Sequence, residues 1–184
     1  MDTPRLQQLY EKKVIAALEN ELGVRNRNAI PRLVKIAINV GCGKTAREAK
    51  ALDAVASTLT AITGQKPVLT KAKKSISNFK LRKGMAVGAM VTLRGRRMYE
   101  FLDKLISVTL PRVRDFQGLS TKAFDRSGNY TIAFREHTVF PEISGEGTEA
   151  PHGLEVTVCT TAKNAHDAEA LLRGFGFPLQ KNEQ

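Results

Sequence analysis

The 184-residue chain contains no tryptophan and only two cysteines, and these shortages limit its chemistry. Cys42 and Cys159 have neither the density of a disulfide scaffold nor the spacing of metal ligands, so we expect reduced thiols. No run of about 18 uncharged apolar residues could cross a bilayer, and the N-terminal stretch lacks the apolar centre of a signal peptide. The sequence therefore predicts a cytoplasmic protein with no membrane partner, no metal and no other cofactor.

Acidic residues are absent from positions 54–99, although this stretch holds ten lysines and arginines. Residues 1–53 hold ten bases against six acids and residues 100–184 hold nine against twelve, so nearly all of the net charge of +11 lies in the middle. A surface this basic would repel itself unless a polyanion supplied the opposite charge. We therefore expect a nucleic acid as the partner.

Periodicity along the chain predicts an α+β fold. Apolar residues at helical spacing predict helices over residues 3–22, 46–63, 95–110 and 165–173, and β-branched runs predict strands over 32–40, 66–71, 86–94, 131–134 and 154–162. We expect one domain over residues 1–184, with a mixed, largely antiparallel sheet, helices on one face and RNA on the other. An extended basic loop at 72–84 and a flexible loop at 144–153 complete the prediction.

Alternation along the strands indicates which residues lie on the open face of the sheet. One face of the first strand is aliphatic, with Val34, Ile36, Ile38 and Val40, and the third strand repeats this pattern. The opposite face offers donors, acceptors and positive charge, together with small residues that would admit a nucleic-acid backbone. Its members are Lys35, Ala37, Asn39, Gln65, Lys71, Gly88, Thr92 and Arg94.

The open face carries no aromatic side chain on which single-stranded bases would stack. Structured RNA, recognised through phosphate, 2′-hydroxyl and shape contacts, is therefore the better match, and RNA is favoured over DNA.

Enzyme motifs are weak. Gly41-Cys42-Gly43-Lys44-Thr45 follows a strand and precedes a helix, as a phosphate-binding loop would, but Ile38 stands where the motif needs its first glycine. His137, His152 and His166 show no ligand spacing, and no acid/base pair of carboxylates is evident. A nucleotide hydrolase using the Gly41–Thr45 turn and a free-standing RNA chaperone remain the alternatives to a structural RNA-binding protein.

Several long motifs resemble the family of bacterial large-subunit ribosomal protein five, in the same order and spacing. They are PRLVKIAINVGCG, ITGQKPVLTKAKKSISNFKLRKG, VGAMVTLRGRRMYEFLDKLI, LPRVRDFQGLS, GNYTIAF, FPEI and VTVCTTAKNAHDAEALL. The chain departs from the family at FDRSGNY, where the family commonly has Phe-Asp-Gly before Gly-Asn-Tyr, and at SGEGTEAPHG and the C-terminal tail.

This resemblance implies a non-enzymatic protein of the central protuberance that binds 5S ribosomal RNA on a concave sheet face and lies beside 23S ribosomal RNA and neighbouring large-subunit proteins. The matching 5S RNA positions are Lys35, Asn39, Gln65, Thr92 and Arg94. The loop would reach the tRNA in the peptidyl site through Lys71, Lys73, Lys74, Ser75, Ser77, Asn78 and Arg82. An arm with Arg112, Arg114, Asp115 and Phe116 would form a bridge to a basic protein of the small-subunit head.

Overall fold

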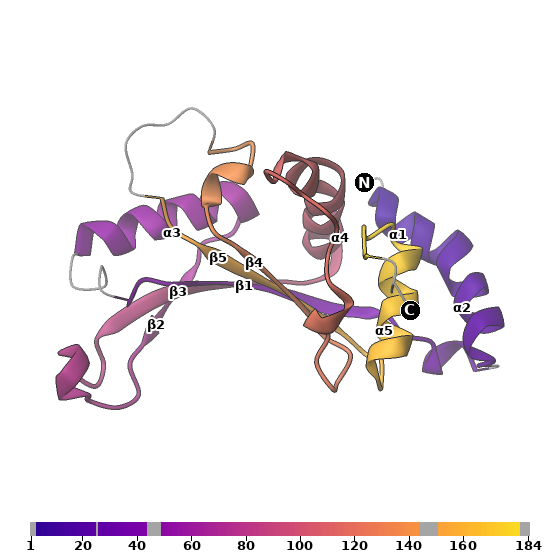
Figure 1. Cartoon of the computed structure of the whole chain (residues 1–184), viewed down its shortest axis with the longest axis horizontal. Helices are drawn as coiled ribbons and strands as arrows, with labels where there is room; N and C mark the ends of the chain where they lie inside the picture. The colour runs from indigo at the N-terminus through magenta and orange to yellow at the C-terminus, as the bar shows by residue number, and fades with distance from the viewer. Residues whose placement is uncertain (1–2, 25, 44–48, 144–150, 181–184) are drawn as a thin grey trace. The chain divides into compact units, whose positions relative to one another are not determined.

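The computed structural model describes residues 3–24, 26–43, 49–143 and 151–180, which form five α-helices and five β-strands (Figure 1). The helices are α1 (Arg5–Leu9), α2 (Ile15–Leu22), α3 (Ala49–Thr63), α4 (Gly95–Lys104) and α5 (Ala165–Gly174). The strands are β1 (Leu33–Gly41), β2 (Val68–Lys71), β3 (Ala86–Leu93), β4 (Tyr130–Phe134) and β5 (Leu154–Thr160). Within these ranges no helix is long and apolar enough to span a membrane.

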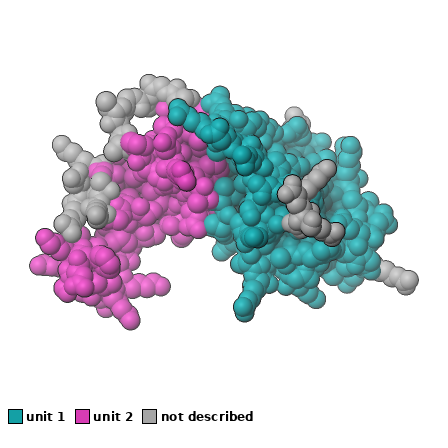
Figure 2. All heavy atoms as spheres, viewed as in Figure 1, with its two compact units in different colours: residues 1–36, 93–132, 157–184 teal, residues 37–92, 133–156 magenta. Residues whose placement is uncertain are grey.

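The strands form one five-stranded antiparallel sheet in the order β2-β3-β1-β5-β4. The α+β class and the antiparallel character of the sheet are therefore confirmed. The chain divides into two compact units, shown in different colours in Figure 2. Unit 1 holds residues 1–36, 93–132 and 157–184, and unit 2 holds residues 37–92 and 133–156. The single 1–184 domain stays a prediction.

Unit 1 is built around helices. The predicted first helix forms as α1 and α2 joined by a π-helical turn, and it ends at Gly23, which adopts the left-handed conformation that glycine tolerates best. Its buried residues Leu6, Val14 and Leu18 lie at helical spacing, and the ring of Tyr10 stacks on Phe175 with centroids 5.7 Å apart. These contacts join the N-terminal and C-terminal helices into one core.

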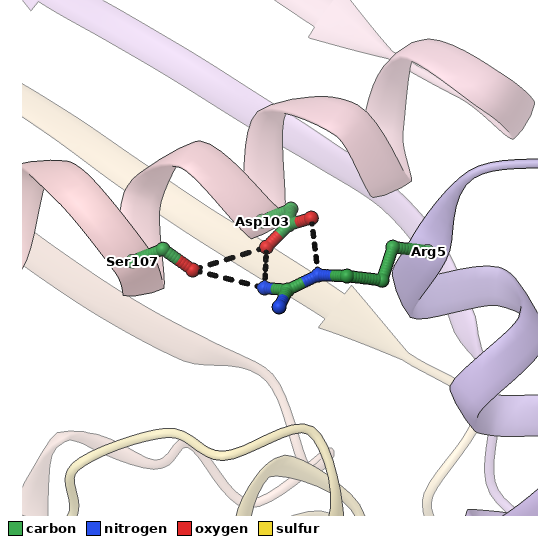
Figure 3. A network of polar contacts seen from close by, with 3 residues as sticks. All are labelled: Arg5, Asp103 and Ser107. Atoms are coloured by element: carbon green, nitrogen blue, oxygen red, sulfur yellow. Dashed lines mark hydrogen bonds and ion pairs between the residues drawn. The ribbon is translucent and has the colours of Figure 1, made fainter.

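A polar network fastens α1 to α4 (Figure 3). The guanidinium of Arg5 donates hydrogen bonds to both carboxylate oxygens of Asp103 and to the hydroxyl of Ser107, which in turn donates to Asp103 at 3.1 Å. The hydrogen bond from Arg5 lowers the pKa of Asp103, and this effect outweighs partial burial, which would raise the pKa. The network links residues that lie nearly 100 positions apart in the sequence.

Unit 2 contains α3 and the greater part of the sheet. Ile38, Val40 and Val91 are almost completely buried, as is the α3 residue Leu59, so the predicted aliphatic face of the sheet is covered in this unit. In Figure 1, α3 runs along this part of the sheet. The prediction was wrong for Val34: at the start of β1 this residue is 39% exposed, whereas its neighbour Leu33 is buried.

Candidate nucleic-acid interface

Three of the predicted RNA-binding residues lie in unit 2: Asn39 on β1, Thr92 on β3, and Gln65 in the bend between α3 and β2. Asn39 is exposed on β1, while Gln65 and Thr92 are half-buried. The side-chain amide of Gln65 donates a hydrogen bond to the main-chain oxygen of Thr92 at 3.2 Å. We call these three residues the polar sheet face. The structure therefore joins two of them directly, although they lie 27 residues apart in the sequence.

The end of α3 fixes the position of Gln65. Gly64 stops the helix in a left-handed conformation with φ +65°, and the amide of Gln65 donates to the hydroxyl of Thr63 at 3.2 Å. The single proton of that hydroxyl is donated to the carbonyl of Leu59 at 2.6 Å, with the carbonyl of Gln65 also within reach at 3.1 Å. These hydrogen bonds fix the backbone at the end of α3. The Gln65 side chain is therefore attached at a fixed point from which it reaches Thr92.

Gly88 corrects one part of the sequence interpretation. Its lack of a side chain was expected to admit an RNA backbone, but Gly88 is buried, and an added Cβ would lie 2.4 Å from the main-chain oxygen of Val40 and 3.0 Å from the hydroxyl of Thr70. The close approach of β1 to β3 is therefore the structural reason for glycine at this position.

The two basic members of the predicted set, Lys35 and Arg94, belong to unit 1. Lys35 is half-buried on β1, and Arg94 is exposed, directly before α4 begins at Gly95. Both side chains are accessible to solvent, and Arg94 makes no side-chain hydrogen bond as the cap of that helix.

The basic loop, residues 72–84, joins β2 to β3 and has an internal structure of its own. The amide of Ala72 donates to the carbonyl of Met85, and Ile76 and Leu81 exchange two main-chain hydrogen bonds of 3.0 Å. The amide of Lys83 donates to the hydroxyl of Ser75 at 2.9 Å. The loop is thus a folded hairpin extension, and Ser75 has a structural bond in addition to its predicted contact.

The side chains predicted to contact the tRNA in the peptidyl site are all exposed to solvent. Lys71, at the end of β2, is exposed, and every loop residue from 73 to 80 is exposed as well. The exposed members of the predicted set are Lys71, Lys73, Lys74, Ser75, Ser77, Asn78 and Arg82. Together with the absence of acids from residues 54–99, this gives the hairpin a strongly positive surface.

Exposed apolar side chains beside these charges were not identified as site residues from the sequence. Val68 is 68% exposed and faces Met90, which is 38% exposed, across the β2–β3 pair. Phe79, near the tip of the basic loop, is 66% exposed. Strand parity gave no signal for Val68, because Gln65 and Lys71, of the opposite parity, were expected on the open face, whereas the register pairs Val68 with Met90 and shifts between Thr70 and Lys71. The presentation of Phe79 depends on the fold of the loop.

The predicted bridge arm lies in unit 1. Arg112, Arg114 and Asp115 are exposed and Phe116 is half-buried. Asp115 has a positive φ of 52°, which is uncommon for a residue with a side chain and marks a tight turn. The arm thus presents two positive charges and one negative charge to solvent.

The alternative phosphate-binding turn has a different structural role in the residues that are described. Cys42 is buried, and its amide donates to the carbonyl of Val87 at 3.0 Å, so this N–H serves the sheet and not a phosphate. Lys44 and Thr45 lie outside the described residues.

Two histidines that showed no ligand spacing meet in the fold. The rings of His137 and His152 stack with centroids 4.0 Å apart, and the amide of His137 donates to the carbonyl of His152 at 3.0 Å. No group of three or more metal-ligating side chains occurs in the part of the chain that the structure describes. The pair therefore joins the two ends of the segment that includes the predicted flexible loop, of which residues 144–150 lie outside the described ranges.

The departure at FDRSGNY forms an ordered turn. One carboxylate oxygen of Asp125 accepts hydrogen bonds from the amides of Ser127 and Asn129, and the other accepts from the Asn129 side chain at 2.8 Å. These hydrogen bonds lower the pKa of Asp125, and the bond from the Asn129 side chain has the largest effect. Arg126 and Ser127 are thus accommodated without loss of the turn.

Comparison with known proteins gives matches along almost the whole chain. Residues 26–82 match the family described as ribosomal protein L5, and residues 86–179 match the model of the C-terminus of that ribosomal protein family. Similar curated proteins include the large ribosomal subunit protein uL5 of Anaeromyxobacter sp. strain Fw109-5, 53% identical over 96% of this chain and 98% of that protein. The uL5 protein of Dichelobacter nodosus is 52% identical over 96% of this chain and 98% of its own length. The uL5 protein of Synechococcus sp. strain JA-2-3B'a(2-13) is also 52% identical, over 95% of this chain and 97% of its own length.

Proposed function

Because this chain belongs to the ribosomal protein L5 family, we propose that it binds 5S ribosomal RNA through the polar sheet face, with Lys35 and Arg94 neutralising phosphates. At the coarser level that the family supports, it is a non-enzymatic structural protein of the large ribosomal subunit, associated with ribosomal RNA in the cytoplasm.

The observation that carries this proposal is the chemistry of the polar sheet face. Asn39 and Thr92 present neutral hydrogen-bonding groups from rigid strands, and Gln65 is held against Thr92. Fixed donors and acceptors suit the 2′-hydroxyls and base edges of a folded RNA, since their geometry sets the register while positive charges supply affinity. The mechanism is binding and positioning without a chemical step.

The basic loop supports the second part of the proposal. We assign Lys71, Lys73, Lys74, Ser75, Ser77, Asn78 and Arg82 to a contact with the tRNA in the peptidyl site. Their exposure and the absence of nearby acids in the sequence suit a phosphate backbone.

The arm is the third part. Arg112, Arg114, Asp115 and Phe116 are assigned to a bridge with a basic protein of the small-subunit head, for which Asp115 is the exposed acidic member. The central protuberance, with 23S ribosomal RNA and neighbouring large-subunit proteins, is the proposed setting.

A matched pair of substitutions tests the 5S RNA site. Asn39→Asp keeps the shape of the side chain but replaces two donors with a negative charge, so the affinity of the purified protein for 5S ribosomal RNA should fall about tenfold or more. Asn20→Asp, on the exposed surface of α2, changes the net charge equally and should leave the dissociation constant within about twofold. Equal losses in the two variants would remove Asn39 from the proposed site.

A further inference from the structure

Phe79 is the exposed aromatic side chain of the basic loop, and its setting is unusual for a solvent-facing ring. It ends a short 3-10 helix, Ser77–Phe79, and is 66% exposed. Lone exposed apolar residues are common on protein surfaces and need no explanation by themselves. The structure of the loop around Phe79 supplies the reason for a functional interpretation.

The backbone at the tip of the loop, where the exposed ring is attached, is closed by main-chain hydrogen bonds. Ile76 and Leu81 exchange two main-chain hydrogen bonds of 3.0 Å, so residues 76–81 form a closed turn. Lys80 follows Phe79 in a left-handed conformation with φ +53°, which is disfavoured for lysine, and its amide donates to the carbonyl of Ser77. The closed turn, with a residue in a disfavoured conformation next to Phe79, fixes the backbone position from which the exposed ring is presented.

The charges around the ring indicate the class of ligand. Lys80 is adjacent in sequence, Arg82 and Lys83 follow, Lys73 and Lys74 lie on the opposite arm of the hairpin, and all five are exposed. Residues 54–99 contain no acid, so a protein partner with an apolar patch and a basic or neutral surface would gain no electrostatic attraction to the loop. A nucleic acid matches it, since phosphates meet the lysines while a base offers an apolar face to the ring.

We propose that Phe79 is a stacking platform for one unpaired base of the RNA that the basic loop reaches. The inference deepens the loop contact described under "Proposed function" and rests on it. The polar sheet face reads structured RNA through hydrogen bonds, whereas the loop tip would recognise a base that has left its helix. The phosphates of a fully paired duplex could contact the lysines, but the duplex would offer no free base to stack on Phe79.

The absence of tryptophan from the chain allows a direct test. Phe79→Trp introduces a single indole fluorophore into the full-length protein, which is titrated with an unpaired octa-adenylate and with a blunt RNA duplex of equal phosphate number. Stacking predicts strong quenching by octa-adenylate and little by the duplex. Ala16→Trp, at an exposed position of α2, is the control and should respond weakly to both RNAs. Equal quenching of the Phe79→Trp variant by both RNAs, or none by either, would overturn the inference.

Aliphatic and aromatic replacements separate base stacking from docking of an apolar protein surface. Phe79→Leu keeps apolar bulk but loses the aromatic face, so the dissociation constant for octa-adenylate should rise about tenfold, while Phe79→Tyr should stay within about twofold. If Phe79→Leu binds as tightly as the parent protein, stacking is wrong.

The double variant Lys73→Glu with Lys74→Glu distinguishes this inference from the loop contact itself. Weak binding of the peptidyl-site tRNA by ribosomes carrying that variant, with normal tRNA retention in Phe79→Leu ribosomes, would overturn the stacking role and leave the loop contact standing. Normal retention in both variants would overturn the two together.

Discussion

The polar sheet face and the basic loop both belong to unit 2, but they present different kinds of surface. The sheet face is neutral, and its side chains are fixed by strand register and by the bond from Gln65 to Thr92. The loop is strongly positive, and its charged side chains are exposed on a hairpin held together mainly by main-chain bonds. Geometry should therefore dominate recognition at the first surface and electrostatic attraction at the second, so changes in packing and changes in salt should affect them unequally.

The largest effect is expected where the strands pack most closely. Gly88→Ala places a Cβ 2.4 Å from the Val40 oxygen, so β1 and β3 must separate, and the free energy of unfolding should fall by about 2–3 kcal/mol. Chemical denaturation measures this change. Gly41→Ala, where an added Cβ meets nothing within 4 Å, is the matched control and should change stability by less than about 0.5 kcal/mol. Similar losses in both variants would show that the spacing of the strands at Gly88 is not the cause.

Charge reversal in the loop should come next. Lys73→Glu with Lys74→Glu turns two attractive charges into repulsive ones, so ribosomes carrying this variant should release peptidyl-site tRNA about tenfold faster, while the purified protein keeps its affinity for 5S RNA. Lys12→Glu with Lys13→Glu makes the same change at two exposed lysines of the first helix and should have little effect on tRNA release. Loss of 5S RNA affinity in the loop variant would make the loop part of the primary site.

A smaller, salt-dependent effect is expected at Arg94. Its side chain is exposed, so Arg94→Ala should preserve the fold and weaken 5S RNA binding about fivefold at low salt, with the slope of log affinity against log salt falling by about one. Filter binding over a salt series measures both quantities. Arg126→Ala, in the exposed turn of unit 1, removes an equal charge and should leave the slope unchanged. An unchanged slope for Arg94→Ala would exclude a phosphate contact there.

The smallest effect lies in the helical core of unit 1. The pKa of Asp103 is lowered chiefly by Arg5, so this carboxylate stabilises the fold fully above its unfolded pKa of about 4 and loses that contribution as pH falls through the lowered value. Asp103→Asn should therefore lower the melting temperature by about 2 °C or less at neutral pH, and the difference from the parent should vanish in acid. A difference independent of pH would contradict this assignment.

Local pattern was enough to predict much of the sheet. Ile36, Ile38 and Val40 alternate with Asn39, and the structure buries the aliphatic residues while leaving Asn39 exposed. Such alternation follows from strand geometry and needs no knowledge of the partner strand. The helices predicted over residues 3–22 and 46–63 likewise end before Gly23 and Gly64, because glycine tolerates the left-handed backbone found there.

Contacts between distant residues could not be read from the sequence. The role of Gly88 depends on how closely β1 approaches, and the stacking of His137 on His152 depends on the path of the intervening segment. Val34 was placed on the buried face by its parity, although the strand begins with Leu33 buried and Val34 exposed. Phe79 is exposed on a turn closed by main-chain bonds within the loop, and composition gives no signal for these bonds.

The most direct test of two separate RNA surfaces is a crossed measurement on Asn39→Asp and on Lys73→Glu with Lys74→Glu. Each variant is assayed for 5S RNA affinity as the purified protein and for retention of peptidyl-site tRNA after assembly into ribosomes at saturating protein. The two surfaces predict that Asn39→Asp loses 5S RNA affinity alone and that the loop variant loses tRNA retention alone. Comparable losses of 5S RNA affinity in both variants would contradict the division and indicate one continuous binding surface.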